Sequence, residues 1–425
     1  MRGVIMSDLF ISVRGRVLIN VEALNMTESV GNYTKHRRVP VVMPGTYATY
    51  FVPSVSGESI AHGYQQVLAE EATRSNLPVC KLCNKGYFLK STNDAIFKES
   101  FGIEPPGDED EFEKTVIKNC TVEDVGGFLY APAGGGRGVK RTSNFFVGYM
   151  IPVRESLESA VIEPQLHTRY ALGTPFVEAG GRVGGQAIYY IELSSAVYTF
   201  SFDLDTKYLG KATFSMSSAG SMVISDEERK KRISITLDAF SKFIMEMMFG
   251  AKKTRFLPVI DWESIVIALS NNTWTVPSPL TVDYIMSALN KQNRINNGTE
   301  LFVYINPALF ENTTSYVRKR TEELLESFYE SLEEFKKKLE ERGDDSLLNW
   351  GEFKKRKLEE FLEKKVDELV ESSDLRYVSA IQRKYNEAKE ELGKGKEKIH
   401  VYENFEECIS GMLDSSKERM EKTEG

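Results

Sequence analysis

The composition of the chain changes abruptly after Phe310, and this change limits the folds open to it. Before that point, alternating and β-branched runs predict strands separated by distant helices. From Tyr316 to about Lys398 the chain is dominated by Glu, Lys and Leu. Apolar residues recur there three and four positions apart, at Leu325, Phe328, Leu332, Phe335 and Leu339, and again at Val378, Ile381, Tyr385, Ala388 and Leu392. The sequence therefore predicts a sheet-containing core and a charged helical module.

The helical module has the form of an insertion. Breaks at residues 342–345 and 372–374 predict an antiparallel hairpin or a three-helix unit across residues 311–397. After it, Lys398 to Glu403 returns to a strand pattern and Asn404 to Leu413 to an amphipathic helix, so residues 398–414 rejoin the core formed by residues 1–310. Two roles stay open for the module: a solvated unit that packs on itself, or an arm that binds a partner or another copy.

The core pattern predicts an α+β fold with helices on one face of a sheet. Helices are expected over Glu58 to Thr73, with Ser56 as N-cap, and over Asp226 to Phe249. Strands are expected at Leu9 to Leu24, Val39 to Phe51, Phe145 to Ile151, Ala187 to Leu204 and Val259 to Leu269.

Composition describes a soluble globular protein: of 425 residues, 41% are hydrophobic and 27% charged. The formal net charge of -8 excludes nucleic-acid binding by overall charge, so any such site must be a local basic patch. The sequence contains no apolar run of the roughly 20 residues that a membrane span needs. It also opens without a signal-peptide pattern, and we expect a cytoplasmic protein that does not bind a membrane.

Catalytic and cofactor motifs are sparse. The histidines His36, His62, His167 and His400 lie in different elements without a hydrolase motif, and only His36 and His167 are candidates for a general base. The glycine runs at residues 134–138 and 180–185 do not fit a dinucleotide fingerprint, so no cofactor is expected. The pair Cys80 and Cys83 is alone in its spacing, which favours packing thiols and leaves metal binding as the alternative.

A basic cluster, Lys35-His36-Arg37-Arg38, is the clearest binding feature. It lies between a strand-like start at Leu18 and a helix that opens at Gly57, and the apolar Val39 follows at once. A solvated loop is the simple alternative, but a rigid strand entrance favours contact with a phosphate backbone.

Separated segments of the first part also match a known family. They are residues 20–25, 28–32, 34–37, 52–58, 61–65, 124–130, 141–143, 148–152, 165–170, 186–188, 194–202 and 254–258. In these segments, over most of residues 13–270, the chain resembles the DevR-like CRISPR-associated backbone subunits of type I-A Cascade.

The resemblance implies an RRM-like or ferredoxin-like antiparallel sheet core with a β-hairpin thumb, here at about residues 166–188. It implies a non-catalytic CRISPR RNA-binding subunit that oligomerises along the guide in an interference complex for antiviral defence. Its partners would be single-stranded guide RNA, copies of itself, other Cascade subunits, and a target DNA strand through guide pairing. The alternative is an RNA endonuclease of the CRISPR system, processing guides through a histidine or cutting targets as type III relatives do. The latter use an aspartate in a loop that here, at residues 25–38, contains no Asp.

The resemblance also implies which residues contact RNA. His167 falls where the family has a histidine that contacts RNA, and Ser54 and Ser56 fit a phosphate cradle at a helix start. The full set is Asn32, Lys35, His36, Arg37, Arg38, Ser54, Ser56, Arg141, His167, Arg169 and Arg255.

Overall fold

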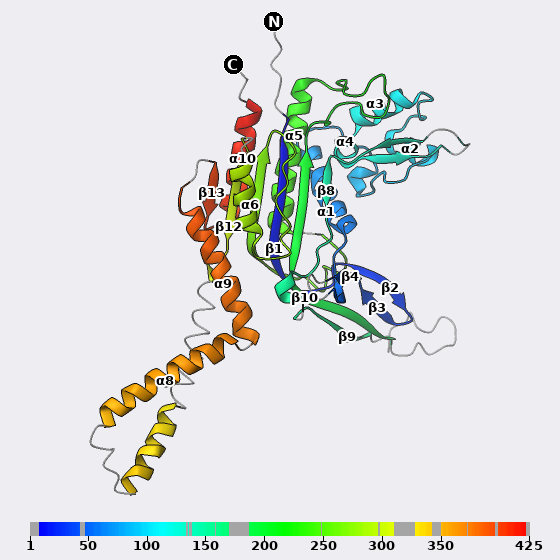
Figure 1. Ribbon diagram of the computed structural model, residues 1–425. Coiled ribbons are helices and arrows are strands. Elements are labelled where there is room, and N and C mark those ends of the chain that lie inside the picture. Colours follow the sequence, from blue (N-terminus) through cyan, green and yellow to red (C-terminus); the bar gives the residue numbers. More distant parts are fainter. Residues whose placement is uncertain are drawn as a thin grey trace, which may run out of the picture. The chain divides into compact units, whose positions relative to one another are not determined.

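The computed structural model describes residues 8–42, 47–132, 135, 138–157, 159–169, 187–247, 249–295, 298–309, 328–341, 350–371, 373–395 and 398–421. The chain divides into two compact units, which are treated separately below (Figure 1). The first unit contains residues 1–305 and 395–425, and the second contains residues 306–394.

A nine-stranded, mostly antiparallel sheet organises the first unit. Its order is β13-β12-β11-β1-β10-β3-β2, and β8 and β9 also pair with β10. Only the β10–β3 and β12–β13 pairs are parallel among the described strands. The bounds are β1 Phe10–Glu22, β2 Met26–Val30, β3 Tyr33–His36, β8 Phe145–Val147, β9 Val161–Arg169, β10 Ala187–Asp205, β11 Val259–Ser270, β12 Glu300–Ile305 and β13 Ile399–Tyr402.

The centre of this sheet has a simple connectivity. The chain runs from β1 through α1 (Gly57–Arg74) to β8 and β10, and then through α5 (Asp226–Glu246) to β11. In space the order is β11-β1-β10-β8, and each neighbouring pair is antiparallel. The long strands and helices predicted here, β1, β10, β11, α1 and α5, are confirmed. Each repeats apolar residues at the spacing of its own secondary structure, and these residues form the buried face of the element.

Both faces of the sheet are covered. Val13 and its cross-strand neighbour Phe202 belong to the core shared with α1 and α5, where the Phe202 and Phe240 rings lie 4.5 Å apart. On the opposite face, Tyr284 of α6 (Tyr284–Arg294) donates a 2.9 Å hydrogen bond to Ser264 of β11. The prediction of helices on one face was therefore wrong, because α6 covers the face that carries Arg16 and Ser264.

A smaller helical lobe follows α1. It contains the 3-10 turn η1 (Cys83–Lys85) and a core of Phe97, Phe112, Phe128 and Tyr130. A second 3-10 turn, η2 (Arg154–Ser156), comes after β8. The remaining elements of the lobe are α2 Asp94–Phe101, α3 Glu109–Asn119, α4 Thr121–Gly126, β6 Phe128–Tyr130 and β7 Val139–Arg141.

The extended segment predicted at Val39 to Phe51 is a hairpin. Its strands β4 (Arg38–Val42) and β5 (Thr49–Pro53) pair antiparallel, with Arg38 opposite Pro53. A second hairpin arm is formed by β9 and the first part of β10, from Ser195 opposite Val161 to Ala187 opposite Arg169. The predicted thumb tip, residues 170–186, lies outside the described residues.

The second unit is helical, with α8 (Trp350–Glu371), α9 (Ser373–Leu392) and a further helix at residues 328–341. Phe328 stacks on Phe361 at 4.4 Å, and Phe335 on Phe353 at 6.0 Å. Along the helix at residues 328–341 the contacts move from Phe328 to Phe335, while on α8 they move back from Phe361 to Phe353. The two helices therefore run antiparallel. The chain then returns to the first unit with β13 and α10 (Phe405–Glu421). Among the described helices, none is long and apolar enough to cross a membrane.

Candidate nucleic-acid interface

The four residues of the basic cluster have different surroundings. Lys35 is exposed and pairs with Glu28, with Nζ 3.2 Å from the carboxylate. Arg38 is half-exposed, and its Nη2 lies 2.9 Å from Oε1 of the buried Glu192. The Arg37 Nε donates to the Asn25 side-chain oxygen at 2.9 Å. Protein groups therefore already satisfy much of the positive charge that the sequence assigns to this cluster.

His36 points inward, which corrects its expected place on the RNA surface. Its side chain is fully buried, with Nε2 2.5 Å from a Glu22 carboxylate oxygen and Nδ1 2.9 Å from the Arg37 carbonyl oxygen. A carbonyl and an ionised carboxylate are both acceptors, so this arrangement favours the imidazole that carries a proton on each nitrogen. Burial alone would lower the pKa of His36, but the hydrogen bond and charge of Glu22 raise it above its usual value.

A β-bulge in β1 aims Glu22 at His36. The register between β1 and β10 shifts between Ile19 and Glu22, and Val21 has a φ of 56°, which is unusual for a β-branched residue. The Val21 amide donates to Ser195 Oγ at 3.0 Å. The bulge leaves Val21 exposed and turns the Glu22 carboxylate into the protein.

Glu192 fixes the strand that carries the cluster. Its carboxylate accepts from the Tyr33 hydroxyl at 3.0 Å and from the His36 amide at 2.7 Å. It borders a hollow of about 580 Å³ lined by Thr27, Glu28, Val30, Tyr33, Lys35, His36, Arg38 and Glu192. Its two carboxylates, Glu28 and Glu192, already pair with Lys35 and Arg38, so the hollow offers a phosphate little unpaired positive charge.

Asn25 joins the cluster to the start of α1. Its side-chain oxygen accepts from Arg37 and, at 2.7 Å, from the Ser56 amide. Ser56 is the predicted N-cap: its hydroxyl accepts from the Ser59 amide at 3.3 Å. Ser54 is fully buried and its amide donates to the Arg37 carbonyl at 3.0 Å. Both serines therefore shape the backbone here, and neither hydroxyl faces solvent as the predicted cradle requires.

A basic loop after α5, residues 250–256, packs against Leu24, the residue that precedes Asn25. The Ala251 amide donates to the Leu24 carbonyl at 2.8 Å. Gly250 has a φ of 87°, and a Cβ there would lie 2.8 Å from that carbonyl oxygen, so the approach requires glycine. The loop carries Lys252, Lys253 and Arg255, of which Lys252 and Arg255 are exposed. Sequence reasoning found Arg255 and missed the two lysines, although the run Lys252-Lys253 was visible.

An aromatic cluster borders the basic loop. The His167 ring stacks on Tyr189 at 5.3 Å and meets the Phe256 ring edge at 5.4 Å. Its Nε2 is buried and has no hydrogen-bond partner within the described part of the chain. The cluster joins the β9–β10 arm to the basic loop, because His167 and Tyr189 lie on the arm and Phe256 on the loop.

One further predicted residue contacts the arm and another lies on it. The Asn32 side chain donates to the Ile188 carbonyl at 2.9 Å and so ties the β2–β3 turn to β10. The Arg169 backbone pairs with Ala187, but its side chain lies outside what the structure describes.

Arg141 is not part of this surface. Its guanidinium is buried in the helical lobe, 2.5 Å from an Asp124 carboxylate oxygen and 3.0 Å from Glu113. It also donates to the carbonyls of Tyr208 and Lys211. With its donors used inside the protein, the arginine stabilises the fold and has none to offer a phosphate.

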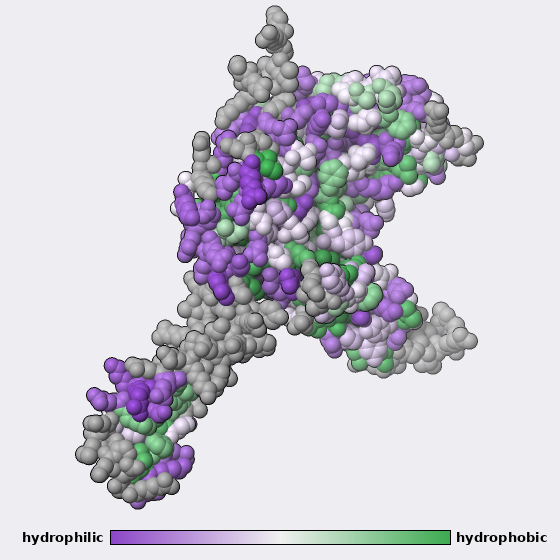
Figure 2. Space-filling view, viewed as in Figure 1, coloured by the Kyte–Doolittle hydropathy of each residue, from purple (hydrophilic) through white to green (hydrophobic). Residues whose placement is uncertain are grey.

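The candidate interface is therefore the surface formed by Arg37, Lys252, Lys253, Arg255 and the aromatic cluster, and we call it the Arg37–Arg255 face. Exposed apolar side chains occur in neighbouring segments, at Phe51, Leu257 and Val259. Figure 2 shows hydrophobic residues gathering at the end of the first unit where Figure 1 labels β4 and β10. Cations beside stacking rings are what single-stranded nucleic acid requires.

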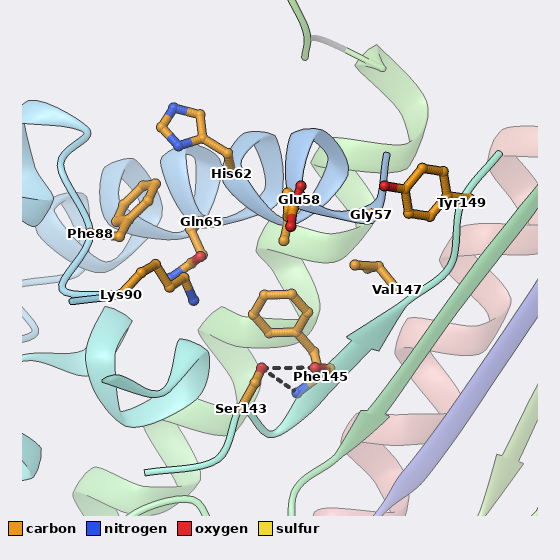
Figure 3. A pocket seen from close by; sticks show the side chains of 11 residues that line it. Gly57, Glu58, His62, Gln65, Phe88, Lys90, Ser143, Phe145, Val147 and Tyr149 are labelled. Carbon is orange, nitrogen blue, oxygen red and sulfur yellow. Dashed lines mark hydrogen bonds between the residues drawn. The ribbon is translucent and has the colours of Figure 1, made fainter. Parts of the chain in front are cut away.

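A larger hollow of about 700 Å³ lies between α1 and the segment around β8 (Figure 3). Glu58, His62 and Gln65 line it from the helix, and Phe145 and Val147 line it from the segment of β8 (Figure 3). The His62 ring points away from β8 and lies 5.0 Å from the Phe88 ring (Figure 3). None of the residues proposed from the sequence lines this hollow, and its wall is mainly apolar. It is therefore a separate feature from the Arg37–Arg255 face.

Comparison with known proteins places these features in context. Residues 13–289 match the model of the family described as CRISPR-associated negative auto-regulator DevR/Csa2. In Saccharolobus solfataricus, "CRISPR-associated protein Cas7/Csa2 1" is 35% identical over 280 residues, which is 65% of this chain and 84% of that protein. From the same organism, "CRISPR-associated aCascade subunit Cas7/Csa2 2" is 36% identical over 300 residues, covering 68% and 89%.

A solved structure also matches at low similarity. One chain of a "CRISPR RNA-guided surveillance complex, pre-nicking" aligns with a TM-score of 0.39 and 9% identity, over 70% of this chain and 91% of that chain. A likeness of this degree supports no argument about function.

Proposed function

This chain belongs to the DevR/Csa2 family of CRISPR-associated proteins, and from that membership we infer that it is a CRISPR RNA-binding backbone subunit of a type I-A Cascade. One relative bears the name of an aCascade subunit. The observation that carries the proposal is the convergence of three segments, residues 24–25, 37 and 250–256, on one basic face beside an aromatic cluster.

The proposed binding reads the backbone of the guide. Arg37, Lys252 and Arg255 would contact phosphates, and Tyr189 and His167 would support a base or a ribose. Because such contacts carry no sequence information, the spacer sequence should not affect affinity. Lys35, Arg38 and Asn32 would lie at the edge of this face, with Arg169 further along the arm.

The sheet connectivity supports the expected fold family. The path β1-α1-β8-β10-α5-β11 with spatial order β11-β1-β10-β8 is the βαββαβ arrangement of ferredoxin-like and RRM-like domains. The β9–β10 arm continues from this core as a hairpin, which fits a thumb that reaches toward a neighbouring copy.

We infer further that the subunit is non-catalytic. His36, one candidate base, is fully buried and both of its ring nitrogens contact protein groups, Glu22 and the Arg37 carbonyl, so it is not placed to take a proton from a substrate. An RNA endonuclease acting through His167 is the alternative, and the observation in its favour is that His167 Nε2 has no hydrogen-bond partner among the described residues. Incubation of the protein with labelled repeat RNA and target RNA, with and without magnesium, separates the two. Specific cleavage that is lost in His167→Ala would favour the enzyme.

The partners we propose are guide RNA, copies of this chain along that guide, other Cascade subunits and the target DNA strand paired to the guide. The second unit, residues 306–394, is either self-contained or an arm for one of these protein partners.

The function is tested by single-stranded RNA binding at several salt concentrations. Arg37→Ala and Arg255→Ala should each weaken binding, and each lost phosphate contact should make the slope of log affinity against log salt less negative by about 0.7. Arg74→Ala is the matched control, because Arg74 is an exposed arginine on α1, 62% accessible, and pairs with Glu70 and Glu71 on the same helix.

Unchanged affinity and slope in the Arg37→Ala and Arg255→Ala variants, with melting temperatures like that of the wild type, would refute the proposed face. An equal loss in the Arg74→Ala variant would also refute it. Native mass spectrometry of the RNA-bound protein reports copies per guide, and a single copy on a long guide would refute a backbone role.

A further inference from the structure

Three cysteines form a buried cluster in the helical lobe. The sulfur atoms of Cys80, Cys83 and Cys120 all lie within 4.8 Å of one another, and all three side chains are buried. None of them forms a disulfide. Two segments supply them: the turn after α1 carries Cys80 and Cys83, and Cys120 stands between α3 and α4.

The turn that carries the first two cysteines has the geometry of a metal-binding knuckle. The Asn84 amide donates to the Cys80 carbonyl at 3.0 Å, and the Gly86 amide to the Cys83 carbonyl at 3.0 Å. Gly86 closes the turn with a φ of 81°. The turn thus presents both sulfurs on one side, at the Cys-x-x-Cys spacing of structural zinc sites.

Glu123 lies beside one of the three sulfurs, that of Cys83, and offers a fourth donor. Its Oε1 lies 2.8 Å from the Cys83 sulfur and also accepts from the Leu89 amide. Its Oε2 is buried and has no hydrogen-bond partner among the residues that the structure describes. An unsatisfied carboxylate oxygen in the interior is costly, so this atom indicates a missing ligand. Burial raises the pKa of Glu123 to about 7.

The alternatives explain less of this arrangement. As packing thiols, three cysteines beside a buried carboxylate bring four acidic groups into one apolar space. The three sulfurs lie within 4.8 Å of one another, and the Glu123 carboxylate is 2.8 Å from one of them, so a cation at this point would satisfy all of them together. A disulfide would use two sulfurs and leave the third thiol and Glu123 unsatisfied.

We propose that Cys80, Cys83 and Cys120 bind one Zn²⁺ ion, with Glu123 as the fourth ligand. Thiolates with one carboxylate suit tetrahedral zinc, and the thiol protons are released to solvent on binding. Lys90 is placed to offset part of the resulting negative charge: its side chain is exposed, the charges of Glu123 and Cys83 act on it, and its Nζ donates to the Gly126 carbonyl at 2.9 Å. The ion would fasten the turn after α1 to the α3–α4 junction.

The test is the metal content of the full chain, purified without chelators and incubated with Zn²⁺. Elemental analysis and native mass spectrometry should find one zinc per chain, and Cys83→Ser and Cys120→Ser should lose it. Cys408→Ser is the matched control, because Cys408 is a buried free cysteine in α10 outside the cluster. It should retain one zinc per chain.

Two measurements on folded protein keep the test decisive if a serine variant unfolds. Co²⁺ added to metal-free wild type should give a thiolate-to-cobalt absorption band, and a chelator should lower the melting temperature of the wild type. Folded wild type that takes up no zinc, or that shows the mass of a disulfide, would overturn the proposal. Full zinc content with an unchanged cobalt spectrum in Glu123→Gln would overturn the assignment of the fourth ligand.

Discussion

Neighbouring residues of the basic cluster at residues 35–38 have different environments, because successive side chains of a strand point to opposite sides. In β3, Lys35 is exposed and His36 is buried against Glu22. The cluster therefore divides into a surface part and an interior ion pair. The interior pair fixes the backbone from which Arg37 reaches the Arg37–Arg255 face.

The ion pair between His36 and Glu22 predicts a pH-dependent stability. His36→Gln leaves a buried carboxylate without its charged partner and should cost about 3 kcal/mol of unfolding free energy at pH 5. Because the folded-state pKa of His36 is raised, its contribution is complete below the unfolded pKa of about 6.5 and is lost as the pH rises through the folded value. Urea denaturation of wild type and variant between pH 5 and pH 9 measures this difference.

Lys35→Gln provides the control for that series, since Lys35 and Glu28 form an exposed pair. It should change stability by less than about 1 kcal/mol at every pH. A cost of His36→Gln that stays constant or grows with pH would contradict the proposed charge state.

At the scale of elements, the packing of α1 on α5 positions the interface. The hydroxyl of Tyr64 on α1 donates to the Thr236 carbonyl of α5 at 3.0 Å, and its ring meets Phe145 and Phe202. Gly63 is the point of closest approach: a Cβ there would lie 2.4 Å from the Phe249 Cβ. The same contact holds the end of α5, and with it the basic loop that follows.

Gly63→Ala should therefore destabilise the protein. Alanine favours a helix over glycine by about 1 kcal/mol, but overpacking against Phe249 costs about 1–3 kcal/mol and the backbone must shift. We expect a net loss, measured by thermal or urea unfolding, and a weaker RNA affinity if the basic loop moves. Gly351→Ala in α8 is the control, because a Cβ there meets nothing within 4 Å among the described residues. If both variants were equally stable, the predicted crowding at Gly63 would be wrong.

At the scale of the whole molecule, the chain leaves the first unit after β12 and returns to it at β13. These strands are parallel, with Leu301 opposite Ile399 and Tyr304 opposite Tyr402. A connection between them must therefore return from the end of β12 to the start of β13. That distance is the length of a strand of four or five residues, roughly 15 Å. The sheet itself does not require a connection as long as residues 306–394.

Replacing residues 306–394 by a ten-residue Gly/Ser linker should leave the first unit folded, since such a linker spans about 18 Å on average. Circular dichroism and unfolding should show a cooperative core, and binding of short RNA should equal that of the full chain. Assembly on long guides then decides between the two roles of the second unit. Full-length assembly would indicate a self-contained module, and truncated assembly an arm for a partner. An unfolded variant would show that the first unit depends on the second.

The sequence by itself determined the local elements. Apolar periods predicted β1, β10, β11, α1 and α5, and Ser56 was identified as the N-cap, because period and capping depend on residues a few positions apart. The family resemblance, over most of residues 13–270, added the proposed function.

Tertiary structure alone decided the site. Sheet register and helix packing turned His36 and Arg141 inward, brought the loop at residues 250–256 to Leu24, and placed Cys120 beside the Cys80–Cys83 turn. Each of these contacts joins residues far apart in the chain, and no local pattern of hydrophobicity or charge encodes such a distance. They depend on which strands pair, in which register, and on the side of the sheet to which each helix returns.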